Sequence, residues 1–209
     1  MNWTRMQVRR IMRGIARLLD RFTGGKLTPN AITIVGAVAH IPIASLIAIH
    51  EFWWAAGLLI IFGLFDTLDG ELARLQKKAS PAGMLLDAST DRFKEVLLYT
   101  GAGYSLAMSS HPAFSAIAVM ACGASICVSY VKAKGESAMI TGQKDIPHAT
   151  LNRLFSDGLA TFEVRMLLLV LGLLFNQLAI SLGVIAVLAS YTALKRLYTI
   201  SRELKPWSK

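Results

Sequence analysis

Residues 66–74 read DTLDGELAR and lie at the end of a long apolar run, and residues 83–91 read GMLLDASTD and lie at the start of the next one. Together they contain four aspartates, Asp66, Asp69, Asp87 and Asp91. An ionised carboxylate inside a membrane-crossing helix costs at least about 2.5 kcal/mol. Acids in this setting therefore indicate a functional cluster with a compensating positive charge.

The spacing places the acids of each stretch on one helix face. Asp66 and Asp69 are separated by one helical turn, as are Asp87 and Asp91. Because the connection at 75–80 is short, the two runs are predicted to form antiparallel neighbouring helices, with all four acids at similar depth. Facing carboxylates repel unless divalent cations bind them, and all-oxygen ligation favours Mg²⁺, Mn²⁺ or Ca²⁺ over zinc or copper.

The rest of the chain is dominated by apolar stretches. The 209 residues are 54% hydrophobic with a mean hydropathy of +0.50, which exceeds that of an ordinary soluble domain. Thr28-Pro29 and Ser80-Pro81 are typical helix starts, a capping side chain followed by proline. The sequence predicts an all-α integral membrane bundle with six transmembrane helices near residues 31–50, 52–74, 81–108, 112–130, 161–178 and 179 or 181–198.

The first 22 residues have a different pattern. Apolar residues recur at helical spacing from Val8 to Phe22, and arginines recur every fourth residue from Arg5 to Arg21. This pattern predicts an amphipathic helix that lies in the lipid headgroup layer. A solvated helix packed on a partner protein is the alternative. The expected organisation is a juxtamembrane helix at 1–26 and a transmembrane domain at 27–209.

The basic residues predict the orientation of the chain. The formal net charge is +9, and all 22 lysines and arginines fall on one side of the predicted helices. By the positive-inside rule this side is cytoplasmic, together with both termini and the acid cluster of a multi-pass protein in the cell membrane. Nucleic acid is excluded as a partner because the basic residues alternate with long apolar runs.

The two opening stretches also carry a recognisable motif. Its spacing resembles the signature of the CDP-alcohol phosphatidyltransferase family in every defined position, and Leu27–Thr33 resembles the family's entry to its first membrane helix. The resemblance implies a six-helix homodimer that transfers a phosphatidyl group from a CDP-lipid, CDP-diacylglycerol or CDP-archaeol, to an alcohol and releases CMP. The defined positions are Asp66, Asp69, Gly70, Ala73, Arg74, Gly83, Asp87 and Asp91.

The resemblance also implies roles for these residues. Asp66, Asp69 and Asp87, completed by Asp91, would bind two Mg²⁺ or Mn²⁺ ions, and Asp91 would act as the general base. Such a site suits phosphoryl-type transfer, which needs charge neutralisation, positioning and a base. The remaining positions are implied to bind the CDP-lipid: Gly70, Ala73, Arg74, Gly83, Asn30 and Thr33.

The acceptor is predicted less directly. Residues 129–134 resemble the branch of the family that uses inositol phosphate, and four basic residues are candidates for binding an acceptor phosphate: Lys132, Lys134, Arg153 and Arg165. Thr161-Phe162-Glu163 departs from that branch, which usually has a second arginine and acidic residues there. Glycerol 3-phosphate therefore remains a competitor, free serine is less favoured, and the basic residues have an alternative role as topology determinants.

Two other classes of membrane protein remain as alternatives. A divalent-cation transporter would have acids at several depths, but Glu51 is the one acid near the opposite face. A non-catalytic scaffold could keep the metal site as structure, although it has less need for Asp91.

Overall fold

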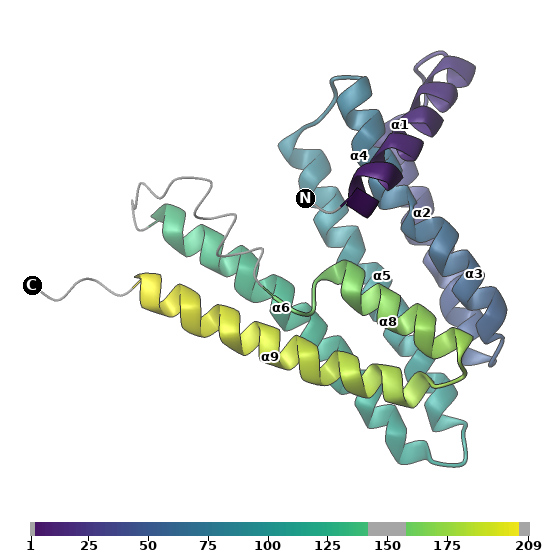
Figure 1. Cartoon of the computed structure of the whole chain (residues 1–209), viewed down its shortest axis with the longest axis vertical. Coiled ribbons are helices and arrows are strands. Elements are labelled where there is room, and N and C mark those ends of the chain that lie inside the picture. Colours follow the sequence, from purple (N-terminus) through teal and green to yellow (C-terminus); the bar gives the residue numbers. More distant parts are fainter. Residues whose placement is uncertain (1–2, 142–157, 205–209) are drawn as a thin grey trace, which may run out of the picture. The chain divides into compact units, whose positions relative to one another are not determined.

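The computed structural model describes residues 3–141 and 158–204, which form helices joined by short connections. No strand occurs among these residues, in agreement with the predicted all-α class. The chain divides into two compact units, residues 1–101 and 102–209. One long helix, α5 (Pro81–Ala107), begins in the first unit and ends in the second (Figure 1).

The first unit is built from five helices. Two glycines end the first of them, because Gly24 and Gly25 have φ values of +58° and +74° that favour glycine. Thr28 then caps the second helix by accepting a hydrogen bond from the Ala31 amide at 3.2 Å, with Pro29 at the first helical position, as predicted. The helices are α1 (Trp3–Thr23), α2 (Pro29–Ala48), α3 (Phe52–Gly63), α4 (Phe65–Leu75) and most of α5.

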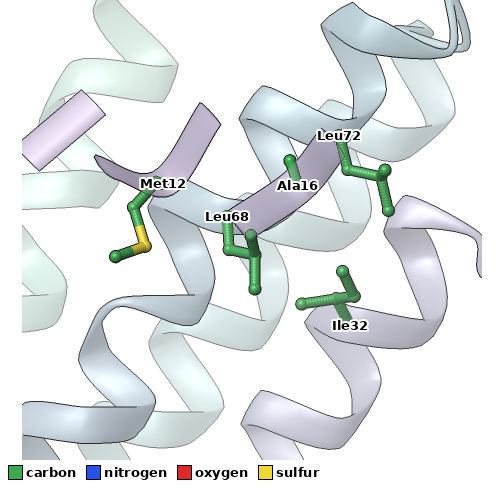
Figure 2. Packing of buried hydrophobic residues seen from close by; sticks show 5 residues of the cluster. All are labelled: Met12, Ala16, Ile32, Leu68 and Leu72. Carbon is green, nitrogen blue, oxygen red and sulfur yellow. The ribbon is translucent and has the colours of Figure 1, made fainter. Parts of the chain in front are cut away.

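A small apolar core joins α1 to α2 and α4. Met12 and Ala16 lie one turn apart on α1 and pack against Ile32 of α2 and against Leu68 and Leu72 of α4 (Figure 2). Burying each larger side chain contributes about 1.5–3 kcal/mol. The core therefore fixes α1 directly on the helix that carries the first two aspartates.

The predicted helix at 52–74 is interrupted at Leu64, which separates α3 from α4. The Leu64 amide donates to Ile61 O at 3.2 Å. This bond spans three residues, as in a 3₁₀-helix, instead of the four residues of an α-helical bond. Gly63 precedes the break, and glycine weakens a helix interior by about 1 kcal/mol. The acid-bearing segment is therefore a short helix of its own.

A tight turn connects α4 to α5. Lys77 adopts a positive φ of 55°, and the Lys78 amide donates to Ala73 O at 2.9 Å, which closes the end of α4. Ser80 Oγ then accepts a hydrogen bond from the Gly83 amide at 3.1 Å, the predicted cap of α5. Further along α5, Gly101 lies directly against the backbone of Ala44.

The second unit is dominated by two long helices that run side by side in the same direction (Figure 1). Small and β-branched residues allow this approach, among them Val128 from α6 and Ala189 and Ala193 from α9. Asn176, with a φ of +53°, lies in the turn that joins α8 to α9. The elements are η1 (Pro112–Phe114), α6 (Ser115–Thr141), α8 (Phe162–Leu174) and α9 (Leu178–Leu204).

Four spans within the described residues are long and apolar enough to cross a membrane: Pro29–Ala48, Phe52–Leu75, Pro112–Met139 and Leu178–Leu204. The protein is thus of the multi-pass membrane type. The predicted spans at 81–108 and 161–178 correspond to α5 and α8, which are not in this set. α5 carries several charged residues, and α8 has 13 residues.

Candidate active site

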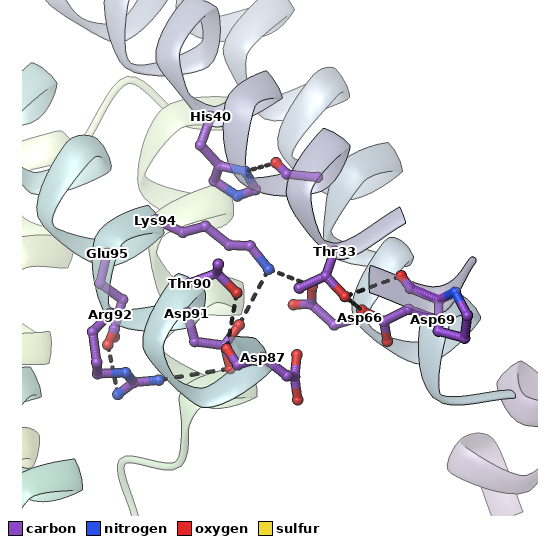
Figure 3. Close-up of polar contacts among 12 residues, drawn as sticks. Thr33, His40, Asp66, Asp69, Asp87, Thr90, Asp91, Arg92, Lys94 and Glu95 are labelled. Carbon is purple, nitrogen blue, oxygen red and sulfur yellow. Dashed lines mark hydrogen bonds and ion pairs between the residues drawn. The ribbon is translucent and has the colours of Figure 1, made fainter. Parts of the chain in front are cut away.

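Three of the four aspartates come together between α4 and α5. One carboxylate oxygen from each of Asp66, Asp69 and Asp87 lies within 4.8 Å of the other two (Figure 3). The short α4–α5 turn explains this, because it reverses the chain and brings residues of α4 beside residues in the first turns of α5. The ligand set is all oxygen, which suits Mg²⁺ or Mn²⁺.

The surroundings of these carboxylates also suit a cation. Thr33 Oγ1 of α2 donates a hydrogen bond to Asp69 Oδ2 at 2.5 Å, and Asp69 is 5% exposed. Asp87 Oδ1 is buried, and no hydrogen-bond partner for it is present among the described residues. A buried acceptor of this kind normally has a partner, and a metal ion would supply one. The residues therefore fit the metal site that the sequence implies.

Asp91, the fourth aspartate, is paired with a lysine. Lys94 Nζ lies 3.2 Å from Asp91 Oδ1 and 2.5 Å from Asp66 Oδ1 (Figure 3). Lys94 is not among the site residues predicted from the sequence, where it counts only as one more basic residue. Its position one turn after Asp91, in an apolar run, is the signal that could have identified it, because lysine is rarely buried unless it is paired.

Arg74 is held by an acid of its own helix. Glu71 is 2% exposed and accepts hydrogen bonds from Arg74 Nη2 at 2.8 Å and from Arg13 Nε of α1 at 3.0 Å. Arg74 also lies over Gly70, where an added Cβ would be 3.4 Å from Arg74 Nη2. Neither Glu71 nor Arg13 is predicted from the sequence. Only their contact across α1 and α4 reveals them.

The other residues implied to bind the CDP-lipid lie on the same helices. An added Cβ at Gly83 would be 3.5 Å from Asn30 Oδ1, so the start of α5 passes close to the start of α2. Asn30 is exposed, and Ala73 is partly buried on α4. Gly83 and Asn30 are thus neighbours within the first unit, although 53 positions separate them in the sequence.

The candidate acceptor residues lie in the second unit. Arg165 is 1% exposed, and its Nη1 donates to Ala160 O at 2.6 Å. Lys132 lies 3.9 Å from Glu136, and both side chains are about half exposed. Lys134 is exposed, and Arg153 lies outside the described residues. The structure therefore separates one deeply buried cation from two lysines at the surface.

A second buried arginine, Arg196 of α9, is not predicted from the sequence. Its Nη1 donates to Val128 O at 3.2 Å, and it interacts with Arg165 as a like charge. Arg196 follows Ala189, Thr192 and Ala193 on the buried face of α9. That helical spacing is the signal that could have placed it inside rather than at the surface.

The chain is similar to known membrane-lipid synthases. The Corynebacterium glutamicum phosphatidylinositol phosphate synthase is 34% identical over 134 residues, which cover 63% of this chain and 60% of that protein. The matched part therefore spans less than two thirds of that relative's length.

Solved structures match over more of the chain. The Mycobacterium tuberculosis phosphatidylinositol phosphate synthase with CDP-DAG bound has a TM-score of 0.77 and 25% identity, over 91% of this chain and 94% of that one. The same protein in complex with manganese and citrate also gives a TM-score of 0.77, at 24% identity, over 91% and 88% of the two chains.

The family model described as CDP-alcohol phosphatidyltransferase matches residues 26–192. The match includes every position of the sequence motif and extends from the start of α2 into α9. The chain therefore belongs to the CDP-alcohol phosphatidyltransferase family.

Proposed function

We propose that the protein transfers a phosphatidyl group from a CDP-activated lipid to the hydroxyl of a polar, phosphorylated alcohol and releases CMP. The convergence of Asp66, Asp69 and Asp87 within 4.8 Å, beside Gly70 and Arg74 of the family motif, is the observation that carries the proposal. The names of the related synthases support the same reaction class.

In this proposal the aspartates hold two divalent ions, Mg²⁺ or Mn²⁺, with Asp91 completing the set. When bound, the ions supply charge neutralisation for the diphosphate and for the attacking and leaving oxygens. Arg74 turns from Glu71 toward the diphosphate, which a guanidinium can bind through two parallel hydrogen bonds. Ala73 and the close neighbours Gly83 and Asn30 border the nucleotide, and Thr33 orients Asp69 from α2.

The reaction then needs one bond exchange and one proton acceptor. The acceptor hydroxyl oxygen attacks the phosphorus on the lipid side of the diphosphate, and the bond from that phosphorus to the CMP oxygen breaks. Asp91 takes the hydroxyl proton. The electron pair of the broken bond leaves with CMP, so the product is a phosphodiester lipid.

We further propose inositol phosphate as the acceptor. Arg165 and Arg196 support a site for its phosphate, because two buried guanidinium groups concentrate the charge and the planar donors that phosphate binds. Lys132, Lys134 and Arg153 are additional candidates. The related Corynebacterium glutamicum protein bears the name phosphatidylinositol phosphate synthase. Glycerol 3-phosphate offers the same phosphate chemistry and is the competing acceptor.

The membrane arrangement is part of the proposal. α5 and α8 complete six spans with the four long apolar ones, and residues 27–209 form this transmembrane domain. α1, within residues 1–26, lies in the headgroup layer: Ile11, Leu18 and Phe22 are exposed while Met12 and Ala16 face α4. The aspartates and both termini are cytoplasmic, and the protein is a homodimer. Cysteine accessibility from each membrane face tests the orientation.

The decisive experiment measures CMP release by purified protein in detergent with CDP-diacylglycerol and Mn²⁺ or Mg²⁺. Inositol 1-phosphate, glycerol 3-phosphate, serine and no acceptor form the panel. We expect release with inositol 1-phosphate that chelator and Asp91→Asn both abolish. Stimulation by glycerol 3-phosphate alone would replace the acceptor but keep the reaction class. Absence of CDP-lipid binding by folded protein would refute the proposal.

A further inference from the structure

The ammonium group of Lys94 lies inside the aspartate cluster, and the proposed function does not use it. Nζ contacts Asp66 Oδ1 at 2.5 Å and Asp91 Oδ1 at 3.2 Å, so one cation joins a carboxylate of α4 to one of α5 (Figure 3). The side chain is 1% exposed. A lysine buried this deeply needs paired charges, and here its partners are two of the carboxylates expected to bind metal.

A second cation, Arg92, is close to the cluster but is directed mainly elsewhere. Arg92 Nη1 lies 2.8 Å from Glu95 Oε2, whereas its Nη2 lies 3.8 Å from Asp91 Oδ2. Arg92 thus lies closer to the buried Glu95 than to Asp91. Within the part of the chain that the structure describes, Lys94 makes the shortest ion pairs with the aspartates.

The other side of the cluster has a different environment. Asp69 accepts a hydrogen bond from a neutral hydroxyl, that of Thr33, and the buried Asp87 Oδ1 has no hydrogen-bond partner within the described residues. These two carboxylates, together with Asp66, form the group whose oxygens converge. The cluster therefore has one side that Lys94 neutralises and one side that remains open to a cation.

We propose that Lys94 is a built-in cation that stands in for one of the two divalent ions in the resting protein. The first ion binds at Asp66, Asp69 and Asp87. The second binds only when the ammonium withdraws from Asp91, so the two ions load in order. This inference rests on the metal site of the proposed function and goes beyond it by assigning unequal ion affinities.

The physical reason is charge competition at short range. Two cations that share the carboxylates of Asp66 and Asp91 repel each other, and their repulsion is strong where water is excluded. Without any metal ion, the same ammonium offsets the mutual repulsion of the carboxylates and holds α4 against α5. Lys94 should therefore weaken binding of the second ion and also stabilise the metal-free protein.

The test is a Mn²⁺ titration of the full-length protein in detergent after chelator treatment, with free Mn²⁺ followed by electron paramagnetic resonance. No lipid donor or acceptor is present. The variants are Lys94→Met, which removes the charge, and Lys94→Arg, which keeps it. Lys78→Met is the matched control, because Lys78 is an exposed lysine in the α4–α5 turn.

We expect the wild-type protein to bind one Mn²⁺ with at least about tenfold higher affinity than a second. Lys94→Met should strengthen the second ion about tenfold or more, while Lys78→Met and Lys94→Arg leave the difference in place. In chelator, Lys94→Met should unfold at a lower temperature than wild type, and Mn²⁺ should restore its stability. Purification with Mn²⁺ present keeps this variant folded for the titration.

Two equal sites in the wild-type protein, or an unchanged second affinity in Lys94→Met, would overturn the inference. So would a metal-free Lys94→Met protein as stable as wild type. These outcomes are independent of CMP release. Release of CMP by a protein that binds both ions equally would support the proposed function and contradict this inference. Ordered Mn²⁺ binding without transferase activity would support this inference and contradict the proposed function.

Discussion

Among the residues that the structure describes, the two compact units contain buried charge of opposite balance. In the first unit, buried acids predominate, and cations compensate them in part: Lys94 lies against Asp66, and Arg13 and Arg74 donate to Glu71. In the second unit, Arg165 and Arg196 are buried near each other, and both donate to backbone carbonyl oxygens. An excess of carboxylate suits divalent cations, whereas a concentration of guanidinium suits phosphate.

This contrast implies that the two units bind different substrates or ions, which can be tested. If the first unit serves the metal ions and the CDP-lipid, substitutions there should remove catalysis at any acceptor concentration. If the second unit serves the acceptor, substitutions there should be overcome by more acceptor. Substitutions in each unit, with each substrate varied in turn, separate the two outcomes.

The largest effect is expected from Asp69→Asn, which keeps the size of the side chain but removes its charge. CMP release should fall at least about a hundredfold, because even residues that only support metal ligands cost 10–100-fold when changed. The loss should persist at saturating acceptor. Glu203→Gln, an exposed acid of the second unit, is the control and should retain full activity. Near-normal CMP release by Asp69→Asn would contradict the assignment of the metal ions to the first unit.

A smaller effect, of a different kind, is expected from Arg165→Gln. A hydrogen bond to a charged group contributes about 1.5–3 kcal/mol, so KM for the phosphorylated acceptor should rise about 10- to 100-fold. The KM for CDP-lipid should not change. Steady-state kinetics with each substrate varied in turn checks this, with exposed Lys195→Met as the control. A change confined to the CDP-lipid would reverse the assignment of the two units.

Helix packing provides a third comparison. Gly101→Ala would press a Cβ into the backbone of Ala44, which cannot rotate away, and should lower the free energy of unfolding by about 1–3 kcal/mol. Gly123→Ala in the second unit meets no atom within 4 Å and should not destabilise the protein. Unfolding of both variants in detergent is the measurement. Equal stability of the two would show that α2 and α5 pack less closely than described.

The smallest effect is expected at the surface link between α1 and α4. Arg13→Ala removes a hydrogen bond to Glu71, but the arginine side chain is 55% exposed, so the loss should be about 0.5–1 kcal/mol. Thermal unfolding at low and high salt should show a difference that shrinks with salt. Arg17→Ala, also exposed on α1, should have no comparable effect. A larger loss of stability in Arg17→Ala than in Arg13→Ala would mean that the hydrogen bond to Glu71 is not what holds α1 on α4.

Local sequence signals predicted much of the first unit. Thr28 and Ser80 cap their helices as expected, because a capping hydrogen bond depends on residues only three positions away. The approach of Asp66 and Asp87 follows from helical spacing and a short turn, which are also local. The break at Leu64 was not predicted, because both sides of it are apolar and read as one continuous run.

The sequence by itself determined the all-α class, the aspartate cluster and the family, because apolar length, helical periodicity and motif spacing are properties of the chain alone. Only the tertiary structure decided what the basic residues contact. Lys94, Arg13 and Arg196 carry the same charge as the other basic residues of this chain, but each has a partner on another helix: Asp66, Glu71 and Val128, respectively. The position and direction of these side chains distinguish them, and both arise only when the helices pack.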